Sequence, residues 1–473
     1  MDTVMSTTSN KYSELVKFAA CLIITTLAGC THIISNEEIP RKVILFIGDG
    51  MDDQQITIAR NYFAGAEGDF TLDLLPHRST VGVLTIDEVN PERPIYVADS
   101  ANSATAMATG KVTSRGRIAT SAKTDQDLVS IIEIAEKAGL NTGVVTTASV
   151  TDATPAAFIS HVNQRGCQGP DNMNGEKGLA GFQSNCPDDL KANGGKGSIA
   201  EQIVASGIDV VLGGGMMYFQ QTEESPGSKN TVLDRAKENG FQVISTKQEL
   251  NRSVNHGRLL GIFSDSTMPI QMIGAGGGKA QLVEKNTAGK MQLPTPFTCI
   301  NNPLAAAAPR LVDMTEIALS TLEGEGQKGF FLMVESASID KESHKRNPCG
   351  SIGEVKQLNE AIVAALTYAK THPETLILVT ADHGQAAQLI PEQSMLSTFF
   401  PSVASPGYMA RIETREGGIM GVNYATNDSK LMEDHTGVQV PLFASGNGSE
   451  TIPSYIKQTD IFRIVINHLG LTR

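Results

Sequence analysis

The sequence predicts an α/β fold in which a doubly wound, mainly parallel central sheet has helices on both faces. Three observations support this prediction: short apolar runs recur along the chain, stretches with helical periodicity separate them, and polar residues follow the ends of several runs. Short apolar runs bounded by turn residues are typical of strands buried on both faces. Strands that alternate with helices favour a mainly parallel sheet.

The expected strands are apolar runs, and the expected helices lie between them. The runs are Val43–Ile47, Thr142–Thr146, Val210–Leu212, Phe330–Val334 and Thr375–Val379. The stretches with helical periodicity include Ser130–Ala138, Ser198–Ser206 and Ile352–Lys370. Ligands of such sheets bind beyond the carboxyl ends of the strands. Carboxylates follow several of these ends, which suggests a metal site there.

One domain is expected over residues 41–473, because the sequence shows no internal repeat and no sharp linker. Two insertions are expected within it. Residues 166–197 are rich in Gly, Asn and Cys, and residues 391–418 contain several Pro and Gly residues typical of a surface excursion.

Composition sets limits on partners. With 473 residues, of which 40% are hydrophobic, the chain can bury a large core. The net charge of −13 argues against a nucleic-acid or anionic-lipid surface, since either favours a basic face. An anionic substrate must therefore be held by local cations, such as bound metals and a few Arg or Lys residues.

Residues 1–29 have the features of a signal peptide. Lysines precede the apolar run Phe18–Leu27, which is too short to span a bilayer. The sequence Leu27-Ala28-Gly29-Cys30 resembles the bacterial lipoprotein signal, in which cleavage precedes a lipidated Cys. We expect an exported, periplasmic protein, anchored to a membrane through Cys30, with residues 30–40 as a tether. An ordinary signal peptide or a buried helix are the alternatives.

The chain has six cysteines, and none lies in a CxxC or His-rich metal pattern. If Cys21 is removed with the signal peptide and Cys30 carries lipid, four remain, and in an exported protein disulfides are expected. Free thiols in a reducing compartment are the alternative. The favoured pairs are Cys167–Cys186, which is local within Gly- and Asn-rich loops, and Cys299–Cys349, which follows by elimination.

The segment Val97–Ala106 places Ser100 before a run of small residues suited to the start of a helix. A helix N-terminus stabilises negative charge, which favours both a serine alkoxide and an incoming phosphate. On its own, however, Asp-Ser-Ala before a helix is also an ordinary helix cap.

Other segments carry side chains that bind metals. Asp340 and His344 are four residues apart, so a helix places both on one face, where they can ligate one ion. Asp382-His383 and Glu433-Asp434-His435 add oxygen and nitrogen ligands of the type that zinc accepts. Asp152-Ala153-Thr154 offers only oxygen ligands, which suit magnesium.

Taken together, these segments resemble bacterial-type alkaline phosphatases, from about residue 41 to residue 469. The motifs that carry the resemblance occur in the order of the family: Ile47-Gly48-Asp49-Gly50-Met51, Asp99-Ser100-Ala101, Asp152-Ala153-Thr154-Pro155-Ala156, Val334-Glu335-Ser336-Ala337-Ser338-Ile339-Asp340, Thr380-Ala381-Asp382-His383 and Glu433-Asp434-His435-Thr436-Gly437.

The resemblance implies two zinc ions and one magnesium ion per subunit, a homodimer, and hydrolysis of phosphate monoesters through a phosphoserine intermediate at Ser100. The implied ligands are Asp340, His344 and His435 for the first zinc, Asp49, Asp382, His383 and the Ser100 oxygen for the second, and Asp49, Asp152, Thr154 and Glu335 for magnesium.

Three further residues are singled out beside these ligands. Arg165 matches the arginine with which the family clamps phosphate, although on the sequence alone it is an ordinary surface residue. For Lys341 two roles stay open, holding phosphate through water or forming a salt bridge to Asp152. Asp52 stands where many relatives have glycine, and no role is predicted for it.

Three alternative functions are compared with the sequence. A sulfatase of the same superfamily needs Cys or Ser followed by x-Pro-x-Arg, and no such run lies near Ser100. A phosphodiesterase stays open, because the sequence does not show whether a second ester group has room. A non-catalytic phosphate- or metal-binding lipoprotein also stays open, although every expected ligand and Ser100 are present.

Overall fold

A ten-stranded sheet forms the centre of the structure, a computed structural model, in the order β22-β2-β21-β17-β1-β16-β5-β8-β10-β9. The strands from β17 to β9 are all parallel, and β21 joins β17 in antiparallel pairing. The bounds are β1 Arg41–Gly48, β2 His77–Gly82, β5 Asn141–Ser149, β8 Val210–Gly214, β9 Phe241–Ile244, β10 Arg258–Ile262, β16 Gly329–Ser336, β17 Thr375–Ala381, β21 Val440–Ser445 and β22 Tyr455–Lys457.

The described residues are 41–177, 183–225, 227–253, 257–287, 289, 291–324, 328–400 and 403–472. The expected signal peptide, the tether and Cys30 lie outside them. Residues 40–473 form one compact unit, while the division into leader, tether and single domain stays a prediction. Among the described residues, no helix has the length and apolar character needed to cross a membrane.

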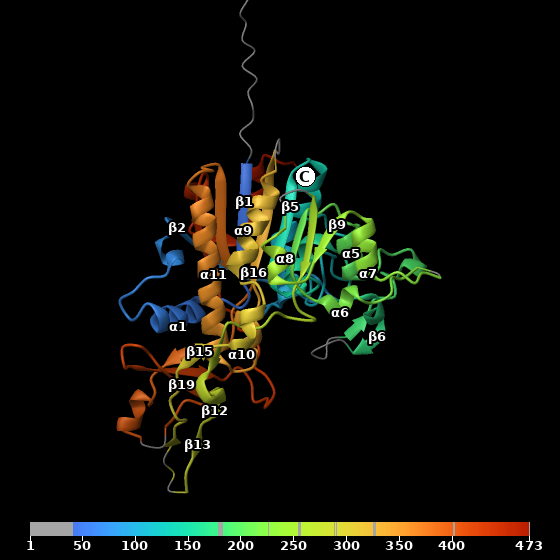
Figure 1. Ribbon diagram of the computed structural model, residues 1–473. Helices are drawn as coiled ribbons and strands as arrows, with labels where there is room; N and C mark the ends of the chain where they lie inside the picture. The colour runs from blue at the N-terminus through green and yellow to red at the C-terminus, as the bar shows by residue number, and fades with distance from the viewer. Residues whose placement is uncertain are drawn as a thin grey trace, which may run out of the picture. The chain divides into compact units, whose positions relative to one another are not determined.

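Two groups of helices cover the sheet. The helices α9 and α11 pack on each other, α11 also packs on β1 and β16, and α9 on β16 and β5; Figure 1 shows the two helices side by side. The helices α2, α3, α4 and α12 form the other group. The bounds are α1 Asp53–Phe63, α2 Ser100–Thr109, α3 Ile131–Lys137, α4 Ala153–Ile159, α5 Ile199–Ala205, α6 Met216–Phe219, α7 Val232–Glu238, α8 Lys247–Leu250, α9 Leu311–Leu322, α10 Ser338–His344, α11 Pro348–Ala369 and α12 Gln458–Leu469.

The expected strands and helices are all present. Each apolar run forms a strand that is buried from end to end between the two layers of helices. In β1 every residue after Arg41 is buried, and all of β16 is buried. The ring of Phe331 in β16 stacks on Phe158 of α4, with centroids 5.8 Å apart. Burying one such side chain contributes about 1.5–3 kcal/mol. This α/β sheet with helices on both faces is the predicted fold class.

Smaller sheets lie outside the central one. A four-stranded sheet, in the order β12-β19-β20-β18, lies with β13 and β15 at the lower end of the unit in Figure 1. Its strand β19 belongs to the segment 391–418, so this segment is more than a surface excursion. The bounds are β3 Thr85–Ile86, β4 Pro94–Ile95, β6 Asn174–Lys177, β7 Gln183–Asn185, β11 Met272–Gly274, β12 Gln281–Leu282, β13 Glu284–Lys285, β14 Met291–Gln292, β15 Cys299–Asn301, β18 Gln388–Ile390, β19 Tyr408–Glu413 and β20 Ile419–Tyr424.

Both expected disulfides are formed. Cys167 is bonded to Cys186, and Cys299 to Cys349. The second bridge connects β15 to the first turn of α11, which follows directly on α10. It therefore ties a peripheral strand to the segment that carries Asp340 and His344.

Candidate active site

The polar residues that follow the strands lie together at the carboxyl edge of the sheet. Neighbouring strands β17, β1, β16 and β5 end at this edge, as their parallel registers require. The residues that they deliver are Asp382 and His383 after β17, Asp49 after β1, Glu335 at the next-to-last position of β16, and Asp152 and Thr154 at the start of α4.

Ser100 is the first residue of α2 and is 3% exposed. Asp99 caps the helix by accepting a hydrogen bond from Asn102 N at 3.1 Å, which fixes where the helix begins. The Ser100 Oγ lies 3.2 Å from His383 Nε2. The serine therefore sits at the positive end of a helix and faces the ligand group that follows β17.

The three histidines of the site are oriented by backbone carbonyl groups. Each Nδ1 atom contacts a carbonyl oxygen. His344 Nδ1 contacts the Glu433 carbonyl, His435 Nδ1 lies 2.9 Å from the Ala98 carbonyl, and His383 Nδ1 lies 3.2 Å from the Gly384 carbonyl. A carbonyl oxygen only accepts, so Nδ1 carries the proton, and the neutral ring keeps its lone pair on Nε2. Burial lowers the pKa of His383 to about 4, so this ring is neutral near pH 7. The His383 ring thus presents an Nε2 acceptor, as metal-binding histidines do. For His435, burial lowers the pKa but the contact with Asp340 outweighs it, so its pKa lies above the ordinary value.

The Nε2 atoms of His344 and His435 meet at Asp340. The two Asp340 oxygens lie 3.3 Å from His344 Nε2 and 3.3 Å from His435 Nε2, and the two Nε2 atoms are 3.1 Å apart. Asp340 and His344 share helix α10, as their spacing predicts. The group is compact enough for one ion to touch all three side chains.

A second group shares His383 with its neighbours. His383 Nε2 lies 3.4 Å from Asp49 Oδ1 and 3.3 Å from Asp382 Oδ2. Candidate metal groups form from Asp49, Asp382 and His383, and from Asp340, His383 and His435. His383 belongs to both, so the two groups are adjacent.

Carboxylates in the second group carry oxygens without a hydrogen-bond partner. Asp49 Oδ1 and Asp382 Oδ2 are buried and accept no hydrogen bond. Burial and the charges of Asp382 and Asp340 raise the pKa of Asp49 well above its ordinary value. Uncompensated buried carboxylates are unfavourable, so this group has the properties of a site for a cation.

A further group offers only oxygen ligands. Glu335 accepts a hydrogen bond from Thr146 Oγ1, and burial raises its pKa to about 7. Thr154 is buried in the first turn of α4, which Asp152 caps. Asp152, Thr154 and Glu335 provide hydroxyl and carboxylate oxygens, the ligands that magnesium prefers.

Two cationic side chains form ion pairs with Asp152. Lys341 Nζ is 2.5 Å from Asp152 Oδ2, and Arg165 Nη2 is 3.1 Å from Asp152 Oδ1. Of the two roles left open for Lys341, the salt bridge is formed. Burial raises the pKa of Asp152, but the charges of Lys341 and Arg165 outweigh it and hold the pKa below its ordinary range. Arg165 Nη1 also lies 3.3 Å from Asp99 Oδ2, which brings the guanidinium beside Ser100.

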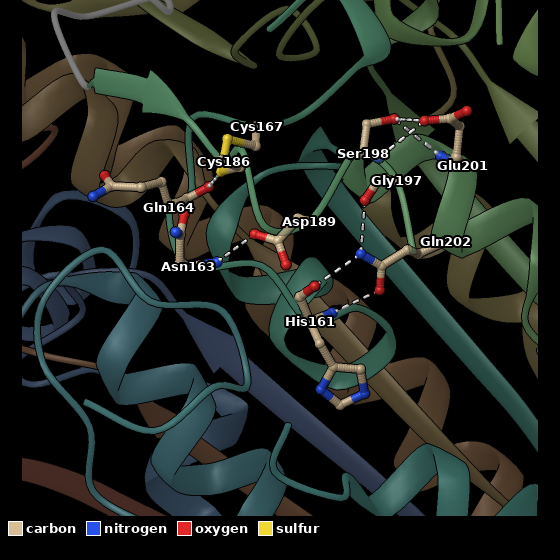
Figure 2. Close-up of a disulfide and its surroundings, with 10 residues drawn as sticks. All are labelled: His161, Asn163, Gln164, Cys167, Cys186, Asp189, Gly197, Ser198, Glu201 and Gln202. Atoms are coloured by element: carbon tan, nitrogen blue, oxygen red, sulfur yellow. Dashed lines mark hydrogen bonds between the residues drawn. A yellow bond between two sulfur atoms is a disulfide. The ribbon is translucent and has the colours of Figure 1, made fainter. Parts of the chain in front are cut away.

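The segment that carries Arg165 is held by the insertion after it and by helix α5 (Figure 2). His161 N donates to Gln202 Oε1 at 2.9 Å, and Gln202 Nε2 donates back to the His161 carbonyl at 2.8 Å. Asn163 N donates to Asp189 Oδ2 at 3.1 Å, and the Cys167–Cys186 bridge follows. The insertion and helix α5 together therefore fix the backbone on both sides of the arginine.

Sequence reasoning missed residues that orient the ligands. Asp52 is the N-cap of α1, accepting from Gln54 N and Gln55 N, and its other oxygen accepts from Gln385 N at 3.3 Å. Gln385 Nε2 in turn donates to Asp340 Oδ1. In the sequence, only the position of Gln385 shortly after Asp382-His383 points to a role at the site. Asp52 thus connects the turn after β1 to the turn after β17.

Comparison with known proteins gives a consistent result. The alkaline phosphatase family model matches residues 40–405. A streptomycin-6-phosphate phosphatase of Streptomyces griseus is 38% identical over 464 residues, covering 96% of each chain. An alkaline phosphatase of Escherichia coli K12 is 38% identical over 439 residues, covering 91% of this chain and 86% of that one.

Solved structures agree on the fold. The alkaline phosphatase of the Antarctic bacterium TAB5 superposes with a TM-score of 0.65 at 24% identity, covering 92% of this chain and 100% of that one. The family model spans most of the chain and the relatives span nearly all of it. The chain therefore belongs to the alkaline phosphatase family, metalloenzymes that hydrolyse phosphate monoesters.

Proposed function

We propose that this phosphatase transfers the phosphoryl group of a monoester first to Ser100 and then to water, at a site for two zinc ions and one magnesium ion. One observation carries the proposal: the Ser100 Oγ lies 3.2 Å from Nε2 of His383, the imidazole shared by both candidate metal groups. A serine with no connection to the metals has no reason to occupy this position.

The residues present fit the proposed ions. Asp49 Oδ1 and Asp382 Oδ2 are buried acceptors without donors, and the histidines turn their Nε2 atoms towards the site carboxylates. Imidazole with carboxylate suits zinc, and hydroxyl with carboxylate suits magnesium. The proposed ligands are Asp340, His344 and His435 for one zinc, Asp49, Asp382, His383 and the Ser100 oxygen for the other, and Asp49, Asp152, Thr154 and Glu335 for magnesium.

When bound, the ions supply Lewis-acid stabilisation of charge on the serine oxygen, the phosphoryl group and the leaving oxygen. The chain itself supplies orientation. The N-terminus of α2 favours the developing charge on Ser100 Oγ, and Asp99 fixes that terminus. Arg165, held between Asp99 and Asp152, presents a planar guanidinium suited to two phosphate oxygens.

In the first step, Ser100 Oγ forms a bond to phosphorus, the bond to the ester oxygen breaks, and the serine proton is balanced by protonation of the departing alcohol. In the second step, water bonds to phosphorus and gives up a proton, the bond to Ser100 Oγ breaks and this oxygen is protonated again, and inorganic phosphate leaves. Two successive displacements give net retention of configuration at phosphorus.

The test of the nucleophile is Ser100→Ala, with Ser103→Ala as the matched control in the same buried helix. We expect Ser100→Ala to keep its zinc and magnesium but to lose phosphoenzyme formation and most of its turnover. Incubation with radioactive phosphate at acidic pH, followed by peptide mapping, locates the label. Label on a peptide without Ser100, or wild-type turnover in Ser100→Ala, overturns the proposal.

Substrate class, location and assembly complete the proposal. We infer a broad preference for monoesters, tested by turnover of an aryl phosphate, an aryl sulfate, a bis-aryl phosphate and streptomycin 6-phosphate, the last taken from the name of the Streptomyces relative. Faster turnover of the sulfate or the diester contradicts it. An exported homodimer anchored through lipidated Cys30 is the proposed form, and mass spectrometry of the mature N-terminus tests the anchor.

A further inference from the structure

Two residues outside the proposed ligand set form a buried ion pair beside the first zinc group. Arg346 Nε donates to Glu433 Oε1 at 2.6 Å, and the two side chains are 6% and 0% exposed. Arg346 comes two residues after His344, and Glu433 two residues before His435. The pair thus links the two chain segments that deliver the imidazoles.

The remaining hydrogen-bonding groups of the pair are satisfied by one loop, Thr426–Glu433, which belongs to no helix or strand. Arg346 Nη1 donates to the Lys430 carbonyl at 3.2 Å, and Nη2 donates to the Ser429 carbonyl. Glu433 Oε2 accepts from Thr426 N at 2.9 Å and from Thr426 Oγ1 at 2.6 Å. The ion pair therefore holds both ends of this loop in place.

The backbone of Glu433 contacts His344 directly. Its carbonyl accepts from His344 Nδ1, and its N–H donates to the His344 carbonyl at 3.1 Å. The same residue that anchors the loop thereby sets the orientation of one imidazole, and the chain reaches His435 two residues later. A shift of Glu433 moves both rings.

Arg346 is itself fixed from the opposite side. Its φ of 56° lies in the left-handed region, where a residue other than glycine is strained. Its guanidinium lies over the ring of Tyr408 in β19, 3.8 Å from the ring centroid, and its carbonyl accepts from Ala280 N at 3.0 Å. The four-stranded sheet therefore provides a firm support for the pair.

We propose that Arg346 and Glu433 are positioning residues that hold His344 and His435 at the spacing required for one zinc ion, and so raise the affinity of this site. The inference rests on the proposed function, since it assumes that His344 and His435 bind zinc. The competing explanation is that the pair only stabilises the fold.

The experiment compares zinc binding by wild type and by the double variant Arg346→Met/Glu433→Gln. Removing both charges avoids an unpaired buried ion, so the unfolding of the metal-free protein should change little. Partners that orient ligands typically alter metal affinity ten- to a hundredfold. We expect one of the two zinc equivalents to bind about ten- to a hundredfold more weakly, in competition with a chromogenic chelator, and the other to be unchanged.

Two further variants keep the result unambiguous. Arg346→Lys keeps the charge but loses the planar donors, and an intermediate zinc affinity is expected even if the double variant folds poorly. Arg411→Met/Glu392→Gln removes another arginine–glutamate pair, in which Arg411 Nε lies 2.7 Å from Glu392 Oε2 beside the same four-stranded sheet. This control should bind zinc as wild type does.

The outcomes separate the two proposals. If wild type binds two zinc equivalents and both the double variant and Arg346→Lys bind them equally tightly, the positioning role is overturned and the proposed function stands. If zinc affinity falls equally in the Arg411 control, the effect comes from the fold and the positioning role is also overturned. If wild type binds no zinc, both proposals fail.

Discussion

Replacing Arg165 by Ala should weaken phosphate binding far more than it weakens the fold. The guanidinium lies 3.3 Å from Asp99 Oδ2 and 3.1 Å from Asp152 Oδ1, so two carboxylates already orient its terminal nitrogens, and one of them belongs to the residue before Ser100. Asp152 also pairs with Lys341, whose Nζ is 2.5 Å from Asp152 Oδ2, so the substitution does not remove the only cation of this carboxylate.

The size of the effect follows from the number of bonds lost. Two charge-assisted hydrogen bonds to phosphate oxygens are each worth about 1.5–3 kcal/mol before water replaces them. With partial replacement by water, a net loss of about 2–4 kcal/mol corresponds to a roughly 30- to several-hundredfold weaker inhibition by inorganic phosphate. Turnover at saturating substrate should persist, because Ser100 and the proposed metal ligands are unchanged.

The assay is competitive inhibition by inorganic phosphate during turnover of an aryl phosphate, with metal content measured on the same sample. Arg235→Ala is the matched control, because Arg235 pairs with Glu223 at 2.9 Å on another part of the unit. Unaltered phosphate inhibition in Arg165→Ala, with normal metal content, refutes the clamp and returns Arg165 to a structural role.

Three other predictions address the metals, a buried acid and a disulfide. Removal of metals by a strong chelator should abolish turnover, and zinc with magnesium should restore it; full activity after verified removal contradicts the metal mechanism. Burial raises the pKa of Glu354 from 4.5 to about 7, so the folded state binds the proton more tightly than the unfolded state. Its contribution to stability is therefore present below pH 4.5 and lost as the pH rises to about 7, by up to about 3 kcal/mol. Glu354→Gln removes this titration, so the free energy of unfolding in urea should differ less between pH 5 and pH 8 in the variant than in wild type. An equal difference in the two proteins contradicts the prediction. Replacing Cys299 and Cys349 by Ser should lower the free energy of unfolding by about 4 kcal/mol, because the bridge closes a loop with a sequence separation of 50; an unchanged urea midpoint contradicts this.

The central strands were predictable because each is buried on both faces and is therefore apolar throughout. The strands at the antiparallel edge of the central sheet were not predictable. The strand β2 contains His77, Arg78 and Ser79, and β21 contains Pro441, so neither resembles a buried parallel strand. The four-stranded sheet pairs β12 with β19, more than a hundred residues later, and no local pattern reveals such pairing.

The ligand residues were predictable from their chemistry and from the family resemblance, but the groups that orient them were not. Carbonyl oxygens of Ala98, Gly384 and Glu433 fix the three imidazoles, and a carbonyl is present at every position in a chain. Gln385 and Asp52 act through contacts between turns far apart in sequence. Such contacts follow from the fold and leave no distinctive spacing.

Charge explains how a protein of net charge −13 can bind a phosphate monoester dianion. Without cations, burial and the charges of Asp382 and Asp340 raise the pKa of Asp49 well above its ordinary value. The proposed ions bring six positive charges, and the site carries as many carboxylates: Asp49, Asp99, Asp152, Glu335, Asp340 and Asp382. The charges of Arg165 and Lys341 then remain, and they equal in size the charge of the dianion. The acidic ligands thus hold the metals without a net negative field, while the arginine and the lysine supply the positive excess that attracts substrate.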